Sequence, residues 1–249
     1  MSEYKLHWAI QTFHRERPYE WKPGANTIAY YKFDGNCNDS SSNWYNLTNN
    51  WLTFNTTLSD GTPVAYLDGS SYAIKTWLNL SLTQGTINIW LKKWQNSSSE
   101  TRWQLASSAW WFRITPTSTT EWNIGHLCYY NGWKWNGSNN TGISNGNWMN
   151  VVAVADTTGN RVYVNWQLVT LSYSNWNSST TMWSVVWDTI VIGRHQSASA
   201  DWTKWYASNL IFEDKARTAQ EVAKYYNRSK WNYQSSNEWW GSTSGAAIQ

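Results

Sequence analysis

Hydrophobic and polar positions alternate along this chain over short stretches that are separated by clusters of Asp, Asn, Gly and Ser. In residues 147–169, two apolar runs at 149–155 and 162–164 flank Asp156-Thr157-Thr158-Gly159-Asn160. β-Branched residues on both sides of such a cluster predict the two strands of a hairpin. The first run is apolar at nearly every position, which indicates a strand covered on both faces. Asn165-Trp166 then predicts a second tight turn.

The same kind of pattern predicts further strands along most of the chain. Residues 86–91 alternate, so that Ile87, Ile89 and Leu91 share one face of a strand and Asn88 and Trp90 share the other. Asp68-Gly69 predicts a hairpin between its flanking strands. The remaining predicted strands are 27–33, 51–54, 64–67, 72–74, 103–106, 111–115, 122–124, 189–194 and 207–212. This series predicts an all-β protein.

The end of the pattern changes from strands to a helix. Thr218 and Glu221 have the spacing of a capping box, and Val222, Tyr225 and Tyr226 follow at helical spacing. We therefore expect a short C-terminal helix that packs on the strands. Residues 1–24 show no clean period and predict an arm, which either docks to a partner or is a loosely ordered leader. Residues 229–249 predict a flexible tail, which leaves 25–228 as one domain.

Composition narrows the classes of function. The chain has 249 residues, 14% of them charged, and a net charge of +3 with scattered basic residues. Nucleic-acid binding requires a basic stripe with stacking aromatics, so this class is disfavoured. No apolar run has the length of a membrane span. The N-terminus lacks the apolar segment of a secretory signal, so a protein acting outside a cell would leave by another route, for example in a virion.

Tryptophan is unusually abundant, with 23 residues against 14 glycines. Trp166 follows Asn165 in a predicted tight turn, where Asn-Gly is usual because both residues need positive φ. Trp44, Trp176, Trp239 and Trp240 also lie in small, polar segments. Either these side chains stack on sugars, or a codon that the source organism reads as Gly was translated as Trp. We favour the second explanation, with Trp90 and Trp148 as true core residues.

The loop 34–43 is the candidate metal site. Asp34, Asn36 and Asp39 alternate in it and offer hard oxygen ligands of the kind that Ca²⁺ prefers. The alternative is that Asp and Asn simply favour turns. The loop also contains Cys37, and the second cysteine is the distant Cys128. Two cysteines do not make a disulfide framework, and we favour two free thiols over a bridge.

The candidate ligand-binding residues are aromatic or imidazole side chains next to predicted turns. Tyr129-Tyr130 precedes Asn131-Gly132, which predicts a hairpin with a type I′ turn. These tyrosines are the best candidates for stacking on a sugar, although cross-strand aromatic pairs are more often structural. His195, which opens the loop 195–204, is the third candidate.

A catalytic role is disfavoured by the pattern of acidic residues. Glycosidases use two carboxylates at a fixed separation across the scissile bond. Glu213 and Asp214 are adjacent, so in a strand they would face opposite sides of the sheet. None of the 16 acidic residues forms a Glu-x-Asp-x-x-Glu pattern, and no Ser/His/Asp set can be assembled. We therefore expect a protein that is not an enzyme.

The order of these segments resembles the laminin-G-like jelly roll of the concanavalin A-like lectin and glucanase superfamily. The resemblance implies two antiparallel sheets packed face to face, a role in binding glycans or proteins, and often a structural Ca²⁺, here at Asp34, Asn36 and Asp39. The family has Gly after the Asn at 165 and small residues near 205, whereas this chain has Trp166 and Trp205. The matching segments are 29–36, 39–41, 67–72, 86–92, 146–152, 161–168, 192–194, 207–212 and 218–227.

These observations predict a two-sheet antiparallel jelly-roll sandwich that acts as a non-catalytic carbohydrate- or protein-binding module. We expect it to be extracellular, cell-surface or virion-associated, with a glycan or a surface protein as its partner. A larger assembly through residues 1–24 fits the predicted arm. The alternatives are a structural domain that decorates a virion or fibre and, less favoured, a glycoside hydrolase of the same superfamily.

Overall fold

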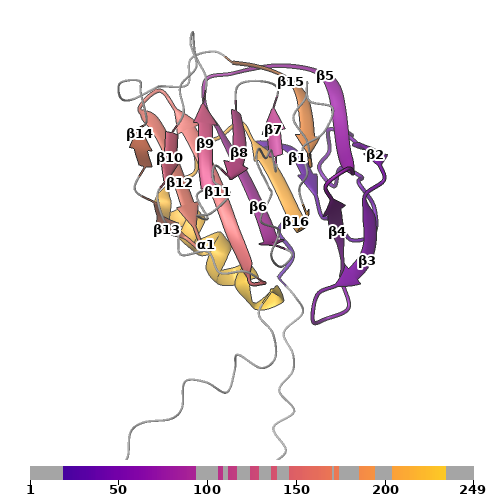
Figure 1. Ribbon diagram of the computed structural model, residues 1–249. Helices are drawn as coiled ribbons and strands as arrows, with labels where there is room; N and C mark the ends of the chain where they lie inside the picture. Colours follow the sequence, from indigo (N-terminus) through magenta and orange to yellow (C-terminus); the bar gives the residue numbers. More distant parts are fainter. Residues whose placement is uncertain are drawn as a thin grey trace, which may run out of the picture.

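A computed structural model shows a mostly β protein of two antiparallel sheets with one short helix, α1 (Ala219–Ser229) (Figure 1). A 3₁₀ turn, η1 (Lys230–Asn232), follows the helix. This confirms the predicted fold class of an all-β, two-sheet protein with a C-terminal helix. The structure describes residues 19–93, 106–108, 112–116, 124–128, 136–138, 146–169, 171–173, 185–193 and 204–233.

Each sheet has eight strands within the described residues. Sheet A contains, from edge to edge, β13 (Gln167–Leu168), β12 (Gly159–Val164), β11 (Trp148–Asp156), β6 (Gly85–Lys93), β16 (Lys204–Glu213), β4 (Pro63–Asp68) and β3 (Thr53–Thr57), and β1 (Thr27–Tyr31) also pairs with β16. Sheet B contains β14 (Leu171–Tyr173), β10 (Asn136–Ser138), β9 (Ile124–Cys128), β8 (Phe112–Pro116), β7 (Ala106–Ser108), β15 (Val185–Ile192), β5 (Tyr72–Leu82) and β2 (Thr48–Asn50).

Strand β6 shows how the sequence divides between two faces. Ile87, Ile89 and Leu91 lie in the main core, which also contains residues of sheet B such as Ile190. Trp90 belongs to a second apolar cluster, on the opposite face of sheet A. The predicted two-faced alternation is confirmed, because successive side chains of a strand point to opposite sides of a sheet.

Strand β11 is covered on both faces, as its nearly continuous apolar run predicts. Val151 and Ala153 lie in the core between the sheets, whereas Val152 and Val154 pack with Val222 of α1. All of them are fully buried. The predicted hairpin with β12 is also confirmed, with pairs running from Val151–Val164 to Asp156–Gly159.

The helix begins with the predicted capping box. The Thr218 hydroxyl accepts a hydrogen bond from the Glu221 backbone N–H, and the Glu221 carboxylate accepts one from the Thr218 N–H. Two N–H groups of the first turn thus gain partners. Val222 and Tyr225 are buried against sheet A, so the helix forms a third layer on its outer face.

A ring stack continues this third layer past the helix. Trp90 stacks with Tyr226, with 5.8 Å between ring centroids and 15° between ring planes, and with Tyr233, at 4.0 Å and 11°. The folded part of the chain therefore extends to Tyr233, beyond the predicted domain boundary at residue 228. The tail prediction of 229–249 begins too early, because Tyr233 supplies apolar surface that the outer face of sheet A buries.

The end of the predicted N-terminal arm packs beside η1. The Tyr19 N–H donates to the Asn232 side-chain oxygen at 3.2 Å, and the Asn232 amide donates back to the Tyr19 carbonyl at 2.9 Å. Trp21 contacts the Tyr30 ring edge-on, with 5.0 Å between centroids. Residues 19 and 232 therefore lie side by side, and the arm prediction for the preceding residues 1–18 lies outside the described part.

One predicted hairpin is wrong. Asp68-Gly69 lies between β4 and β5, but these strands belong to different sheets: β4 pairs with β3 and β16, and β5 pairs with β2 and β15. The Asp68 carboxylate accepts hydrogen bonds from the Ser70 and Ser71 N–H groups, and Gly69 has φ +98°. An Asx turn of this kind reverses the chain equally well within a sheet or between two sheets.

The predicted strand at 51–54 is wrong in its first half. Residues 51 and 52 form the connection between β2 and β3, and only residues 53 and 54 lie in a strand. β2 ends at Asn50 and belongs to sheet B, whereas β3 begins at Thr53 and belongs to sheet A. Trp51 lies between them with φ +66°, in the left-handed region. The chain therefore changes sheet between Asn50 and Thr53, and this change interrupts the predicted strand.

Candidate binding surface

The loop between β1 and β2 is organised by one buried carboxylate, that of Asp39. Its Oδ1 accepts hydrogen bonds from the N–H groups of Tyr30 at 2.9 Å and Ser41 at 2.8 Å. Its Oδ2 accepts from the Ser41 hydroxyl at 2.7 Å and the Tyr45 N–H at 2.9 Å. Four donors occupy the two oxygens, so Asp39 holds the loop closed against β1.

Asp34 and Asn36 have the opposite environment, since both are exposed at the outer side of this loop. The Asn36 amide donates to the Asp34 Oδ1 at 3.5 Å, a long hydrogen bond, and the Asn36 oxygen accepts from the Asn38 N–H at 2.8 Å. The Asp34 carboxylate is thus an exposed acceptor on a loop whose base is fixed by Asp39. Such a group can accept a hydroxyl of a sugar or contact a cation.

The three residues predicted to hold Ca²⁺ are therefore not equivalent. Asp39 could ligate a metal only by exchanging its four hydrogen bonds, whereas Asp34 and Asn36 face solvent. Over the described stretches, no three or more His, Cys, Asp or Glu side chains are grouped to hold a metal ion. Calcium at this loop stays a prediction, and it depends on Asp34, Asn36 and oxygens other than those of Asp39.

The predicted ligand-binding residues Tyr129, Tyr130 and His195 lie outside the described residues. The strands next to them are described: β9, which ends at Cys128, pairs antiparallel with β10, and the predicted type I′ turn at Asn131-Gly132 between them lies outside the described residues. β15 ends at Ile192 and runs opposite to β9, because the pairs β9–β8, β8–β7 and β7–β15 are all antiparallel. The chain thus leaves sheet B in opposite directions after Cys128 and Ile192. The three assignments stay predictions.

Two further carboxylates, those of Asp156 and Asp68, stabilise the turns in which they lie. Burial raises the pKa of the Asp156 carboxyl, but hydrogen bonds from Thr158 and Arg161 outweigh this effect, so its pKa lies below the ordinary value. In the same way, burial of Asp68 is outweighed by hydrogen bonds from Ser70 and Ser71, and its pKa is also lowered. Both groups are ionised and stabilise loops, and neither lies beside a second carboxylate in these contacts.

The carboxylates near α1 are engaged in ion pairs. Glu213 is buried and pairs with the buried Arg217, whose guanidinium lies 5.8 Å from the Trp21 ring centroid and 5.2 Å from that of Tyr225. Lys215 and the Thr218 backbone N–H lower the pKa of Glu221. Glu213 therefore stabilises the connection between β16 and α1, and Glu221 caps the start of α1, so both have structural roles.

The loop also contains Cys37, which is buried and free. Burial raises the pKa of its thiol to about 12. The prediction of a free thiol is thus confirmed for Cys37, and the side chain of Cys128 lies outside the described part.

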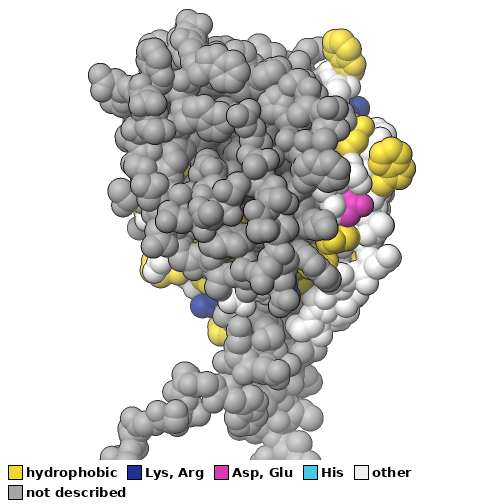
Figure 2. Space-filling view, viewed as in Figure 1, with side chains coloured by type: hydrophobic (Ala, Val, Ile, Leu, Met, Phe, Trp, Pro, Cys, Tyr) yellow, Lys and Arg dark blue, Asp and Glu magenta, His cyan; other side chains and the backbone are white. Residues whose placement is uncertain are grey.

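Large exposed aromatic side chains are a second surface feature. Figure 2 shows such groups standing out from the edge of the molecule that carries β2, β3 and β5 in Figure 1. Trp44, Trp51 and Trp77 are 77%, 76% and 84% exposed, and Trp166 of the β12–β13 turn is 46% exposed. The sequence singled out Trp44 and Trp166 as residues in glycine-like positions. It missed Trp51, although Asn50-Trp51 repeats the Asn-Trp pair of the other two turns.

Comparison with known proteins identifies the fold. No family model and no curated protein matches the sequence. Among solved structures, the chain is similar to the botulinum neurotoxin serotype D ligand binding domain in complex with N-acetylneuraminic acid, with 16% identity, a TM-score of 0.61, and coverage of 81% of this chain and 50% of that one. It is also similar to the binding domain of Paraclostridial Mosquitocidal Protein 1, with 13% identity, a TM-score of 0.65 and coverage of 81% and 52%.

A third similar structure is the botulinum neurotoxin type G receptor binding domain, with 18% identity, a TM-score of 0.56 and coverage of 82% and 51%. This chain thus spans about half the length of the solved structures that it matches. At these identities the likeness shows the fold, which is that of β-rich toxin binding domains. Within the described residues, no helix is both long and apolar enough to cross a bilayer.

Proposed function

We propose that this chain is a non-catalytic module that binds a carbohydrate or a protein, as part of an extracellular, cell-surface or virion-associated adhesion structure. The observation that carries the proposal is the likeness of 81% of the chain to receptor- and ligand-binding domains of toxins. The engagement of Asp39, Asp68, Asp156 and Glu213 by their own loops and ion pairs supports a binding role over a catalytic one.

The binding surface in this proposal is the outer side of the β1–β2 loop. Asp34 and Asn36 present an exposed carboxylate and an amide, and Asp39 fixes the backbone beneath them with four hydrogen bonds. Exposed acceptors on a rigid loop suit recognition, because little conformational entropy is lost when the ligand is bound. Calcium at Asp34 and Asn36 would join the loop to ligand hydroxyls.

Attachment to a larger structure is the second part of the proposal. Tyr19 is hydrogen-bonded to Asn232, which follows α1 closely. A connection to a partner through residues 1–18 would therefore leave the domain beside α1. A structural domain of a virion or fibre would use the same attachment without binding a glycan. Recovery of the chain inside an assembly, with no ligand bound on an array, would favour that second role.

The direct test is a glycan array probed with the intact chain, with and without EDTA. Specific binding supports the module, and loss of binding in EDTA supports calcium. We expect Asp34→Ala to weaken binding about tenfold, since a hydrogen bond to a charged group is removed. The matched control is Asp60→Ala, which removes an exposed carboxylate from the β3–β4 turn. Equal binding by the two variants would exclude the β1–β2 loop as the binding surface.

A further inference from the structure

Four tryptophans have a backbone conformation that belongs to glycine. Positive φ favours glycine, because a Cβ clashes with the backbone there. Within the described part of the chain, seven residues other than glycine have positive φ, and four of them are Trp. The four are Trp44 (59°), Trp51 (66°), Trp77 (64°) and Trp166 (68°), and the positive-φ glycines are Gly35, Gly61, Gly69, Gly146, Gly159 and Gly193.

The local structure at these positions also asks for glycine. Asn165 and Trp166 form the two-residue connection between β12 and β13, with Val164 paired to Gln167 and φ of 48° and 68°. A two-residue hairpin with both φ values positive is the type I′ turn, for which Asn-Gly is the preferred pair. Trp44 and Trp51 follow Asn43 and Asn50, so the same pair recurs twice more.

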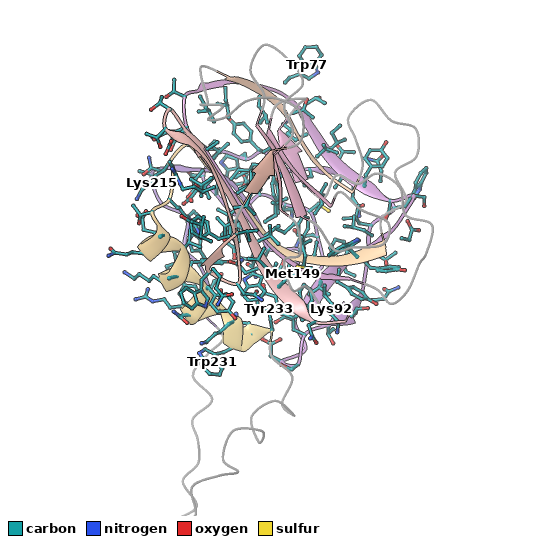
Figure 3. All side chains as sticks on the ribbon, turned by 60° about the vertical axis from the view of Figure 1, so that its left-hand side comes forward. Trp77, Lys92, Met149, Lys215, Trp231 and Tyr233 are labelled. Atoms are coloured by element: carbon teal, nitrogen blue, oxygen red, sulfur yellow. The ribbon has the colours of Figure 1, made fainter. Side chains whose placement is uncertain are left out.

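Trp77 lies in β5, where the pairing register with β15 shifts. Trp187 pairs with Leu80 but Thr189 pairs with Thr76, so β5 has extra residues in this interval. A glycine in the left-handed region is a common way to form such a bulge. Figure 3 shows the Trp77 side chain standing away from the body of the protein.

Packing does not compensate for the strain at these four sites. Their side chains are between 46% and 84% exposed. Phe33 also has positive φ, but it is only 1% exposed and stacks on Tyr31, so burial offsets its conformation. By contrast, Trp90 is buried, has ring partners and does not have positive φ. Among the described tryptophans, positive φ therefore occurs only at exposed positions, and the exposed Trp231 does not have it.

We infer that the native protein has glycine at positions 44, 51, 77 and 166, because its source organism reads as Gly a codon that was translated here as Trp. Trp21, Trp90 and Trp148, which pack in the third layer, are native tryptophans. The inference is independent of the proposed function. It has a consequence for the proposed function: within the described residues, Trp231 would be the one tryptophan left among the exposed large hydrophobic side chains, which favours recognition by polar loops over sugar stacking there.

Peptide mass spectrometry of the protein purified from its source organism tests the inference directly. We expect the peptides that cover positions 44, 51, 77 and 166 to have glycine masses, and the peptide that covers Trp90 to have a tryptophan mass. Tryptophan masses at the four positions would overturn the inference and leave the exposed indoles as a stacking surface. Glycine at position 90 as well would contradict the assignment of Trp90 as a native tryptophan.

Recombinant variants give a second, independent readout. We expect the variant with all four positions changed to Gly to unfold several degrees above the chain with Trp, because positive φ is not strained for Gly. The matched control changes the same four positions to Ala, which removes the indoles but keeps the Cβ. An equal rise for Ala and Gly would assign the gain to loss of exposed apolar surface and would overturn the backbone argument. Trp90→Gly should lower the unfolding temperature.

Discussion

At the scale of residues, Asp34 and Asp39 show how one loop uses the same side chain for two purposes. Asp39 is buried and accepts four hydrogen bonds, whereas Asp34 is exposed and accepts one long hydrogen bond from Asn36. The Asp39 side chain determines the shape of the loop, and the Asp34 side chain is available to a ligand. Stability and binding should therefore be separable by mutation within this loop.

Asp39→Ala should lower the free energy of unfolding by about 2–3 kcal/mol, because the Tyr30 and Tyr45 N–H groups would lose their acceptor. Asp34→Ala should change it by less than about 0.5 kcal/mol, as expected for an exposed group. Urea unfolding followed by circular dichroism measures both. A loss for Asp39→Ala as small as that for Asp34→Ala would show that the carboxylate does not hold the loop.

Cys37 gives a second prediction for this loop. Its thiol is buried and burial raises its pKa to about 12, so little thiolate forms near neutral pH. Iodoacetamide should label Cys37 slowly in the folded protein and rapidly in urea, as measured by peptide mass spectrometry. Fast labelling of the folded protein, or recovery of Cys37 in a disulfide with Cys128, would contradict the buried free thiol.

At the scale of elements, the third layer on sheet A extends to the end of η1. Tyr233 stacks on Trp90, and its hydroxyl donates to Ser208 and accepts from the Asn209 amide. The residues after α1 therefore belong to the folded body. Because Asn232 is hydrogen-bonded to Tyr19, η1 also links the N-terminal and C-terminal ends of the described residues.

Shortening the chain at this element tests its role. A chain that ends at residue 228 should lose about 3 kcal/mol of unfolding free energy, which is typical of removing a buried aromatic side chain. The control is a chain that ends at residue 233, which should be as stable as the full chain in urea. Equal stability of all three chains would return residues 229–233 to the tail that the sequence predicts.

The sequence predicted which face of a strand each side chain lies on better than it predicted which strands pair with each other. The alternation in β6 and the apolar run in β11 follow from a two-residue period, which is local and can be read directly. The change of sheet between β4 and β5 depends on which strands are free to pair, so Asp68-Gly69 alone could not show it. The sequence also could not separate Asp39 from Asp34, since Asp favours turns and ligands alike.

At the scale of the whole molecule, stability should depend on pH in the acid range. The carboxyls of Asp68, Asp156 and Glu221 have folded pKa values below their ordinary values of 3.8, 3.8 and 4.5. Their contribution is present above the unfolded pKa and is lost as pH falls through the folded pKa. The urea midpoint should therefore decrease between about pH 5 and about pH 3. A midpoint that stays constant over this range would contradict these contacts.

The two sheets and the helix form a scaffold of the kind found in toxin binding domains, and we propose that this molecule recognises a ligand without chemistry. The central measurement is isothermal titration of the intact chain with a glycan selected on the array, followed by mass spectrometry of the recovered glycan. The account predicts saturable binding with the glycan recovered unchanged. Recovery of a shortened glycan would contradict it, because the chain would then be an enzyme.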